Sequence, residues 1–523
     1  MVMTMAEKYP IGVQSFAKLR ESGYTYVDKT EYIEKLITKG NCFFLSRPRR
    51  FGKSLLLSTI EAYYQGRRDL FEGLAISRGD HDWQPHPVLH IAFNAHEYIR
   101  PDSLLEKFGY DFNEWEKLYG TELRGASHSE RFRYFIKQAY AVTGQKVVIL
   151  IDEYDKPLLD TAGNKELQDI YRSQLKAFYG NLKNCDQYIE FAMLTGVSRF
   201  GKLSIFSDLN NLQDISLSEE YSAICGMTIE EIRDNFDAGV RQLAVRNEMS
   251  VDEAYAQLKK NYDGYHFSPT SPDIYNPFSL LSALSSGYFG AYWFSTGTPT
   301  FLVKMIRDMQ IDLRDLEHIE EKLNNLMDAS FDLSNAIPLM YQSGYLTIRS
   351  YDPRFRTVQL DYPNEEVEQG FLDMLMKIYT ESRSGRSEFD VRRFVLDVEA
   401  GRVDDFMTRL QALFSGYQYD QIDLGNLELH YRNVIYLAMK LMGFYTHAEM
   451  RTAAGRIDLL VKTPDYLYLF EFKINKSAQA AMNQINARDY LLPFHADGRR
   501  IVKVGVNFDD IIRSISEWIV EFE

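Results

Sequence analysis

The segment from Asn41 to Gln65 constrains the fold more than any other part of the chain. Its apolar stretch, residues 42–45, predicts a buried parallel strand, after which a basic turn leads to Gly52-Lys53-Ser54 at the start of an apolar-periodic helix. A strand, a turn and GKS at a helix start are typical of a phosphate-binding loop, where backbone N–H groups and the helix dipole hold the anion. In such a loop Lys53 reaches the β- and γ-phosphates and Ser54 holds Mg²⁺. The residues expected to bind the nucleotide are Arg49, Arg50, Phe51, Gly52, Lys53, Ser54 and Leu55.

The loop departs from the usual pattern at its first position. Glycine is expected five residues before Gly52, and the chain has Arg47 there. Pro48 and two further arginines follow, so the loop is expected to be stiffer and more basic than the usual form.

A second apolar strand, within residues 146–155, delivers acids at its carboxyl end. A phosphate-loop enzyme needs one acid to hold Mg²⁺ through water and often a second to activate the attacking water. Asp152 fits the first role and Glu153 the second. The alternative is a buried strand that ends in two solvated acids.

A third strand, residues 190–194, is followed by further polar residues. Thr195 is placed to sense the γ-phosphate. Arg199 could stabilise transition-state charge, either in the same chain or from a neighbouring subunit of a homo-oligomer. Arg199 could equally be a surface arginine in a loop.

Several blocks of sequence together resemble the AAA-ATPase-like family of bacterial proteins. They are FFLSRPRRFGKSLLLSTIEAYYQG, VVILIDEYDKPLLD and LTGVSRFGKLSIFSDLNNLQDISL, with residues 11–30, NYDGYHFS at 261–268 and YNPFS at 275–279. The resemblance covers roughly residues 8–300. It implies an ATP-binding fold of the additional-strand type, with ATP and Mg²⁺ as cofactors, and RPRRFGKS is the family's own form of the loop.

The middle of the chain reads as mostly helical. Residues 221–345 have helical apolar spacing and resemble the helical lid that follows such ATPase cores. Residues 340–362 alternate like a β-hairpin, and 365–415 return to helix. Residues 23–29 read as a short strand.

The C-terminal region carries a second candidate site. A helix over 427–444 precedes two strands, 456–462 and 466–474. On the second strand, Glu471 and Lys473 fall on the same face as apolar residues, and unpaired buried charge is costly. A metal site supplies a reason, because Asp458 and Glu471 can ligate Mg²⁺ while Lys473 polarises the attacking water. The alternative is an edge strand whose Glu-Lys pair faces water.

This order of elements looks like the PD-(D/E)XK nuclease fold. GRIDLLV matches its Asp motif and EFK its catalytic strand, over roughly residues 400–523. The resemblance implies a role for Gln484 in the following helix, which also contains Tyr490, and for Glu428 as an acid ligand near the start of the preceding helix.

Composition limits the class of protein. The 523 residues suit about three domains, and the net charge of −15 argues against a protein that coats nucleic acid non-specifically. No apolar run approaches membrane-spanning length, and no signal peptide is seen at the N-terminus. The three scattered cysteines are typical of a reducing compartment, so we expect a cytoplasmic protein with no membrane partner.

The sequence therefore predicts an α/β protein with four regions. They are a P-loop core (1–222), a helical lid (223–300), a connecting helical and β-hairpin region (301–410) and a nuclease-like domain (411–523). The leading function is a nucleotide-regulated nuclease that cuts DNA or RNA with Mg²⁺. The alternatives are an ATP-driven switch whose C-terminal domain binds nucleic acid or a partner protein without cutting, and an NTPase scaffold with no nucleic-acid role.

Overall fold

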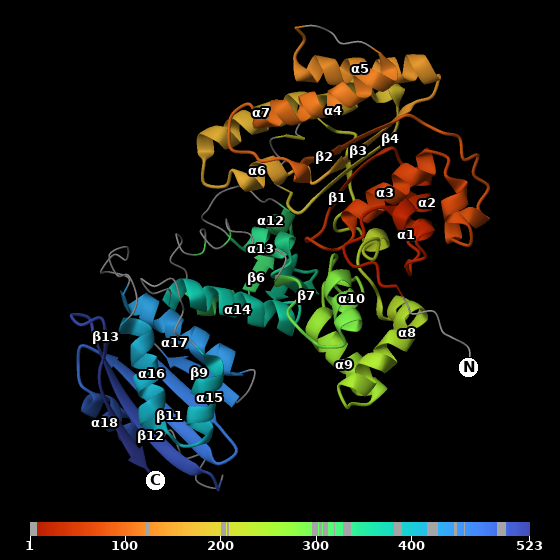
Figure 1. The fold of residues 1–523 in the computed structure, drawn as a ribbon. Coiled ribbons are helices and arrows are strands. Elements are labelled where there is room, and N and C mark those ends of the chain that lie inside the picture. The colour runs from red at the N-terminus through yellow and green to blue at the C-terminus, as the bar shows by residue number, and fades with distance from the viewer. Residues whose placement is uncertain are drawn as a thin grey trace. The chain divides into compact units, whose positions relative to one another are not determined.

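The structure, a computed structural model, divides the chain into two compact units (Figure 1). One comprises Met1–Met305 with His318–Glu368, and the other Ile306–Glu317 with Gln369–Glu523. The residues that the structure describes are 8–120, 125–199, 205–206, 209–294, 302, 306, 312–317, 319–327, 336–380, 390–415, 427–443, 447–453, 456–488 and 498–523. Both units combine helices with a sheet, so the predicted α/β class is confirmed.

A five-stranded parallel sheet is central to the first unit, with strand order β2-β3-β4-β1-β5. The strands are β1 (Cys42–Ser46), β2 (Val88–Ala92), β3 (Val147–Asp152), β4 (Ile189–Gly196) and β5 (Gln213–Asp214). Because β4 lies between the strand before the phosphate loop and the acidic strand, the predicted additional-strand arrangement is confirmed. Residues 23–29 form no strand, so that prediction is wrong.

Helices cover both faces of this sheet. Figure 1 shows α4, α5 and α7 on one face and α1, α2 and α3 on the other. Every residue of β1 and β3 is buried, as expected of parallel strands covered on both sides. The helices are α1 (Phe16–Glu21), α2 (Thr30–Lys39), α3 (Lys53–Tyr64), α4 (Ser103–Tyr119), α5 (His128–Thr143), α6 (Lys156–Asp160) and α7 (Lys165–Asn184).

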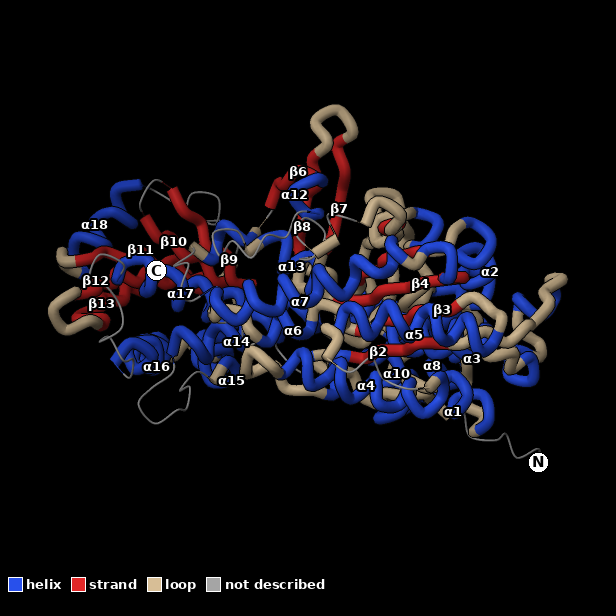
Figure 2. Tube along the Cα trace, turned by 90° about the horizontal axis from the view of Figure 1, so that it is seen from above, coloured by secondary structure: helices blue, strands red, loops and turns tan. Residues whose placement is uncertain are grey.

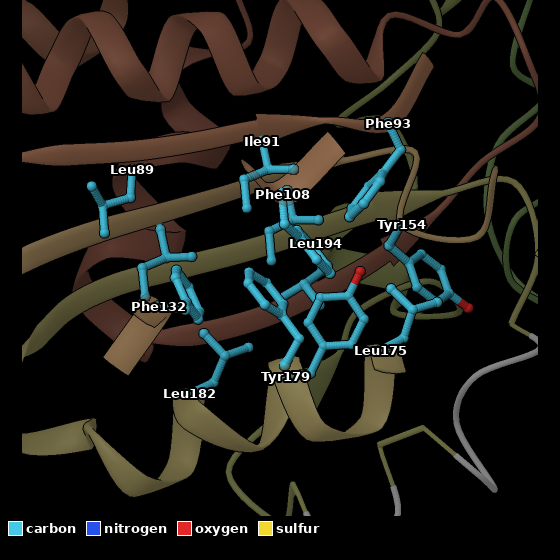
Figure 3. Packing of buried hydrophobic residues seen from close by; sticks show 14 of the residues in the cluster. Leu89, Ile91, Phe93, Phe108, Phe132, Tyr154, Leu175, Tyr179, Leu182 and Leu194 are labelled. Atoms are coloured by element: carbon cyan, nitrogen blue, oxygen red, sulfur yellow. The ribbon is translucent and has the colours of Figure 1, made fainter. Parts of the chain in front are cut away.

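An aromatic core fixes α4, α5 and α7 to the sheet (Figure 3). The Phe178 ring on α7 stacks on Phe132 and Phe108, with centroids 4.1 Å and 4.2 Å away. Such offset pairs add to the free energy gained by burying the rings. Leu89, Ile91 and Leu194 supply the strand side of this core.

Three helices follow the sheet in the region that the sequence predicts to be a helical lid. They are α8 (Ile229–Arg246), α9 (Val251–Tyr262) and α10 (Pro277–Ser286), which share one apolar cluster. Thr228 and Ser250 each begin a capping box, and the Asn276 side chain caps α10 ahead of Pro277.

A small antiparallel sheet, in the order β6-β8-β7, completes the first unit. Its strands are β6 (Ile319–Lys322), β7 (Thr347–Asp352) and β8 (Thr357–Asp361), and the helices nearby in sequence are α12 (Leu323–Met327), α13 (Ile337–Ser343) and α14 (Glu365–Thr380). The hairpin predicted over 340–362 is confirmed for β7 and β8 and wrong for residues 340–343, which belong to α13.

The second unit contains a mixed five-stranded sheet in the order β13-β12-β11-β10-β9, whose strands are red in Figure 2. The strands are β9 (His447–Ala453), β10 (Arg456–Lys462), β11 (Tyr466–Ile474), β12 (Arg500–Asp509) and β13 (Ser514–Phe522). The helices are α15 (Val391–Glu399), α16 (Val403–Ser415), α17 (Leu427–Gly443) and α18 (Ala478–Arg488). Among the described residues, no helix has the length and apolar character to cross a membrane.

Candidate functional site

The predicted phosphate loop joins β1 to α3 in the first unit. The helix begins at Lys53, and Gly52 before it has left-handed backbone, with φ of 94°. Arg50 is also left-handed, with φ of 69°, which for a residue other than glycine costs about 1–3 kcal/mol. The loop therefore has a specific, strained shape that its surroundings must maintain.

Lys53 is buried inside this loop. Its Nζ donates to the carbonyl oxygens of Arg47 and Pro48, at 2.9 Å each. Burial lowers the pKa of Lys53, and the nearby Glu153 and Asp152 carboxylates oppose that shift. The two carbonyl groups give the buried cation the hydrogen-bond partners that a buried charge requires.

Asp152 brings three predicted residues together at the carboxyl edge of the sheet. Its side chain accepts hydrogen bonds from Ser54 Oγ at 2.5 Å and from Thr195 Oγ1 at 2.7 Å. Asp152 is buried and comes from β3, Ser54 from α3 and Thr195 from β4. Hydroxyl and carboxylate oxygens are ligands that Mg²⁺ prefers, so these residues fit the expected metal.

Glu153 follows Asp152 but lies in a different environment. Its backbone is left-handed, with φ of 52°, and its side chain lines the cavity beside the loop. Burial raises the pKa of Glu153, and the Lys53 cation opposes that shift. A carboxylate with a raised pKa is better able to accept a proton from water.

The cavity beside the loop has a volume of about 550 Å³, within the range of small-molecule sites. All seven loop residues predicted to bind the nucleotide line it, together with Glu153. Residues 10–14 before α1 and several lid residues form other parts of the wall, among them Met227, Pro277, Phe278 and Leu281. The phosphate loop, the edge of the sheet and the lid thus line one cavity.

Three residues of this region were missed by the sequence reasoning. Asn94 after β2 and Lys156 at the start of α6 both line the cavity. Asp155 is buried and accepts hydrogen bonds from the Val197 and Ser198 backbone N–H groups and from Ser198 Oγ. Their positions in the sequence could have indicated Asn94 and Asp155. Asn94 follows a sheet strand, and Asp155 lies in the same DEYD stretch as the predicted acids.

Arg199 lies in a buried ion pair with Asp214, and its backbone N–H donates to Gln342 Oε1 at 2.8 Å. The surface-loop alternative for Arg199 is therefore wrong. Its predicted catalytic role stays a prediction.

The candidate nuclease site lies on β11, a central strand of the second sheet. Glu471 is 1% exposed, and its Oε1 accepts hydrogen bonds from Lys473 Nζ at 2.6 Å and from Gln484 Nε2 on α18. The alternative of a solvent-facing pair on an edge strand is therefore wrong. Three of the predicted residues meet here, around a buried carboxylate.

Asp458 is placed by strand register. It lies opposite Glu471 in the antiparallel β10–β11 pair, and opposite residues of such a pair lie on one face of the sheet. The side chains of Asp458 and Glu428, and the whole of Tyr490, lie outside the described residues. Among the side chains that are described, no group of three acids, histidines or cysteines could hold a metal ion.

Close backbone packing brings α18 to Glu471. A Cβ atom on Gly505 of β12 would lie 2.6 Å from the Ala478 carbonyl oxygen and 2.8 Å from the Met482 nitrogen. Glycine at 505 thus lets the helix that carries Gln484 lie directly on the sheet.

The strand order and the loop define a P-loop ATPase core of the AAA type, joined to a C-terminal domain of the PD-(D/E)XK class. Residues 10–206 match the family described as Predicted AAA-ATPase, and residues 426–518 match the PD-(D/E)XK nuclease superfamily. The chain belongs to this predicted AAA-ATPase family and carries a PD-(D/E)XK domain at its C-terminus.

A full-length relative and a solved structure were also found. The relative is described as an uncharacterized protein in the vnfD 5′ region of Azotobacter chroococcum mcd 1, and it is 35% identical over 98% of this chain and 99% of its own length. The structure is that of the Aeropyrum pernix ORC2 protein in ADPNP-ADP complexes. It covers 66% of this chain and 90% of that chain at 12% identity, with a TM-score of 0.24, too slight a likeness to inform function.

Proposed function

We propose that this protein binds and hydrolyses ATP in its first unit, and that its C-terminal domain is a Mg²⁺-dependent nuclease acting on DNA or RNA. The single observation that carries the first half is the convergence of Lys53, Ser54 and Asp152 beside a cavity of nucleotide size. The fold and the family match support an ATPase in the same place.

Each residue of the first site has a role in this proposal. Lys53 and the loop N–H groups bind the phosphates, and Thr195 holds Asp152 in place. Glu153 takes a proton from the attacking water. Mg²⁺ bound by Ser54 and Asp152 would supply charge neutralisation on the phosphates.

The nuclease half rests on the buried Glu471 with Lys473 and Gln484 around it. A buried acid beside a lysine on a central strand needs a reason, because desolvating the two charges is costly. In the proposed reaction Lys473 orients the attacking water, and Glu471 with Asp458 would hold Mg²⁺, which raises the acidity of bound water.

One observation favours the switch that binds without cutting. Glu471 is almost fully covered, and its Oε1 already accepts bonds from Lys473 and Gln484. Under this second proposal the contact is structural, and the domain holds nucleic acid or a partner protein. A cytoplasmic location and assembly into a homo-oligomer stay predictions.

Lys53→Ala tests the ATP site. We expect it to abolish ATP binding measured by calorimetry, because it removes the only lysine of the loop. Lys156→Ala serves as a lysine control that lies on the cavity wall outside the loop, and it should reduce affinity far less. A folded Lys53→Ala protein with parental affinity would contradict the assignment.

Incubation of the full chain with single- and double-stranded DNA and RNA tests the nuclease half. Cleavage that requires Mg²⁺ and stops with chelator is the expected result. Binding of a nucleic acid without any cleavage would favour the switch instead.

A further inference from the structure

The NYDGYHF turn, residues 261–267, is a block of sequence to which the proposed function assigns no role. It comprises the last two residues of α9 and the first part of the loop that leads to α10, and it does not line the nucleotide cavity. Tyr265 and Phe267 are buried, although both belong to a polar turn. Their ring contacts are with the phosphate loop.

The first contact is with Arg47, the residue that stands where a phosphate loop usually has glycine. The Arg47 guanidinium lies over the Phe267 ring, 4.1 Å from its centroid, and the residue is 1% exposed. It donates to the carbonyl oxygens of Ser46 and Ser216 at 2.9 Å and 2.8 Å and of Tyr221 at 3.0 Å. Arg47 therefore joins the loop to the turn, and it is not among the residues that line the cavity.

The second contact is with Phe51, just before the glycine of GKS. Its ring packs edge-on against Tyr265 at 4.8 Å and Phe267 at 5.3 Å. Between these two anchored positions lies Arg50, whose left-handed backbone needs support from its surroundings.

Two further loop residues, Arg49 and Pro48, are held by residues from outside the loop. The Trp293 indole Nε1 donates to the Arg49 carbonyl at 3.2 Å. A Cβ atom on Gly344 would lie 2.8 Å from Pro48 Cβ, so α13 ends directly against the loop. This external packing replaces the glycine-rich turn by which such loops usually fit around phosphate.

We propose that Tyr265 and Phe267 form an aromatic clamp that positions the phosphate loop for ATP, without touching the nucleotide. The inference rests on the proposed ATP site. A loop held in its binding shape loses less freedom when ATP binds, so the clamp should act on affinity and leave the chemical step unchanged. Both rings are positioning residues.

The test is ATP affinity and turnover in Phe267→Leu, which keeps an apolar side chain and removes the ring. We expect the dissociation constant to rise about tenfold, while kcat stays close to the parental value. Phe267→Tyr keeps the ring and should bind ATP as the parent does. Tyr288→Leu is a matched control, because it removes a ring under Arg246, 4.3 Å away in the lid, and should leave ATP affinity unchanged.

Arg47→Lys tests the same contact from the side of the loop, because it keeps the positive charge and loses the planar group that stacks on Phe267. It should also weaken ATP binding, and the double variant with Phe267→Leu should weaken binding by less than the two single effects added together, because both substitutions remove the contact between Arg47 and Phe267. If Phe267→Leu does not fold, Arg47→Lys alone decides.

Parental ATP affinity in Phe267→Leu or, where that variant does not fold, in Arg47→Lys would overturn the proposal. So would a fall in kcat with affinity unchanged. If Lys53→Ala binds ATP as well as the parent, the proposed site itself fails. If Lys53→Ala loses binding and the clamp variants do not, only the clamp fails.

Discussion

Two neighbouring acids at the end of β3 have different environments. Asp152 is hydrogen-bonded by Ser54 and Thr195, whereas Glu153 lines the cavity from a left-handed backbone position. This difference supports the proposal that Asp152 holds the metal while Glu153 accepts the proton.

Glu153→Gln should separate binding from hydrolysis. The amide keeps the shape of the side chain but cannot accept the proton, so ATP should still bind while turnover falls by about 10²–10⁴-fold. Phosphate release under saturating ATP measures this. Turnover at the parental rate would show that the base lies elsewhere.

Sequence pattern predicted that Lys53 and Ser54 open a helix and that Asp152 and Thr195 lie where strands end, and the structure has them at the start of α3 and at the carboxyl ends of β3 and β4. The packing of Arg47 could not be predicted, since its partners Ser216 and Phe267 lie about 170 and 220 residues further along the chain. Gln484 was found through family resemblance, and the backbone contact at Gly505 that places its helix has no local signature.

At the scale of elements, buried strands were the most predictable parts. The apolar runs of β1, β3 and β4 gave their positions to within two residues. The edge strand β13 was not predicted, because four of its nine residues are polar and its pairing depends on its partner, β12. Residues 23–29 have strand-like composition, but no neighbouring strand pairs with them among the described residues.

Glu366, near the start of α14, is a buried acid that is hydrogen-bonded to Trp293, the residue whose indole contacts the phosphate loop. Glu366 is 5% exposed, and its Oε1 accepts a hydrogen bond from the Trp293 backbone N–H at 2.7 Å. Burial raises the pKa of Glu366 to about 7 from an ordinary value of 4.5, and the Trp293 hydrogen bond opposes the shift. We therefore expect the contribution of Glu366 to stability to depend on pH.

The sign of this effect follows from linkage. The folded protein holds the Glu366 proton more tightly than the unfolded chain does. The contribution of protonated Glu366 to the free energy of unfolding is therefore complete below about pH 4.5, and it is lost as the pH rises through about 7. The loss should approach about 3 kcal/mol. Urea unfolding at several pH values gives the free energy of unfolding of the parent and of Glu366→Gln. The difference between the two proteins, followed against pH, measures the contribution of Glu366. An identical pH dependence in both would contradict the prediction.

At the scale of the whole molecule, the two candidate sites lie in separate compact units of one chain. Residues Ile306–Glu317 already belong to the second unit, and the chain passes into that unit a second time within α14, after Glu368. Nucleotide control of cleavage would require that ATP binding in the first unit changes the cleavage rate in the second unit.

The most direct test of the account is Mg²⁺-dependent cleavage of nucleic acid by the full chain, with and without ATP, in the parent and four variants. We expect ATP to change the parental rate and to have no effect on Lys53→Ala. Asp458→Ala, Glu471→Ala and Lys473→Ala should abolish cleavage with ATP binding intact. Cleavage that survives in all three of these variants would contradict the nuclease assignment, and a parental rate indifferent to ATP would contradict nucleotide control.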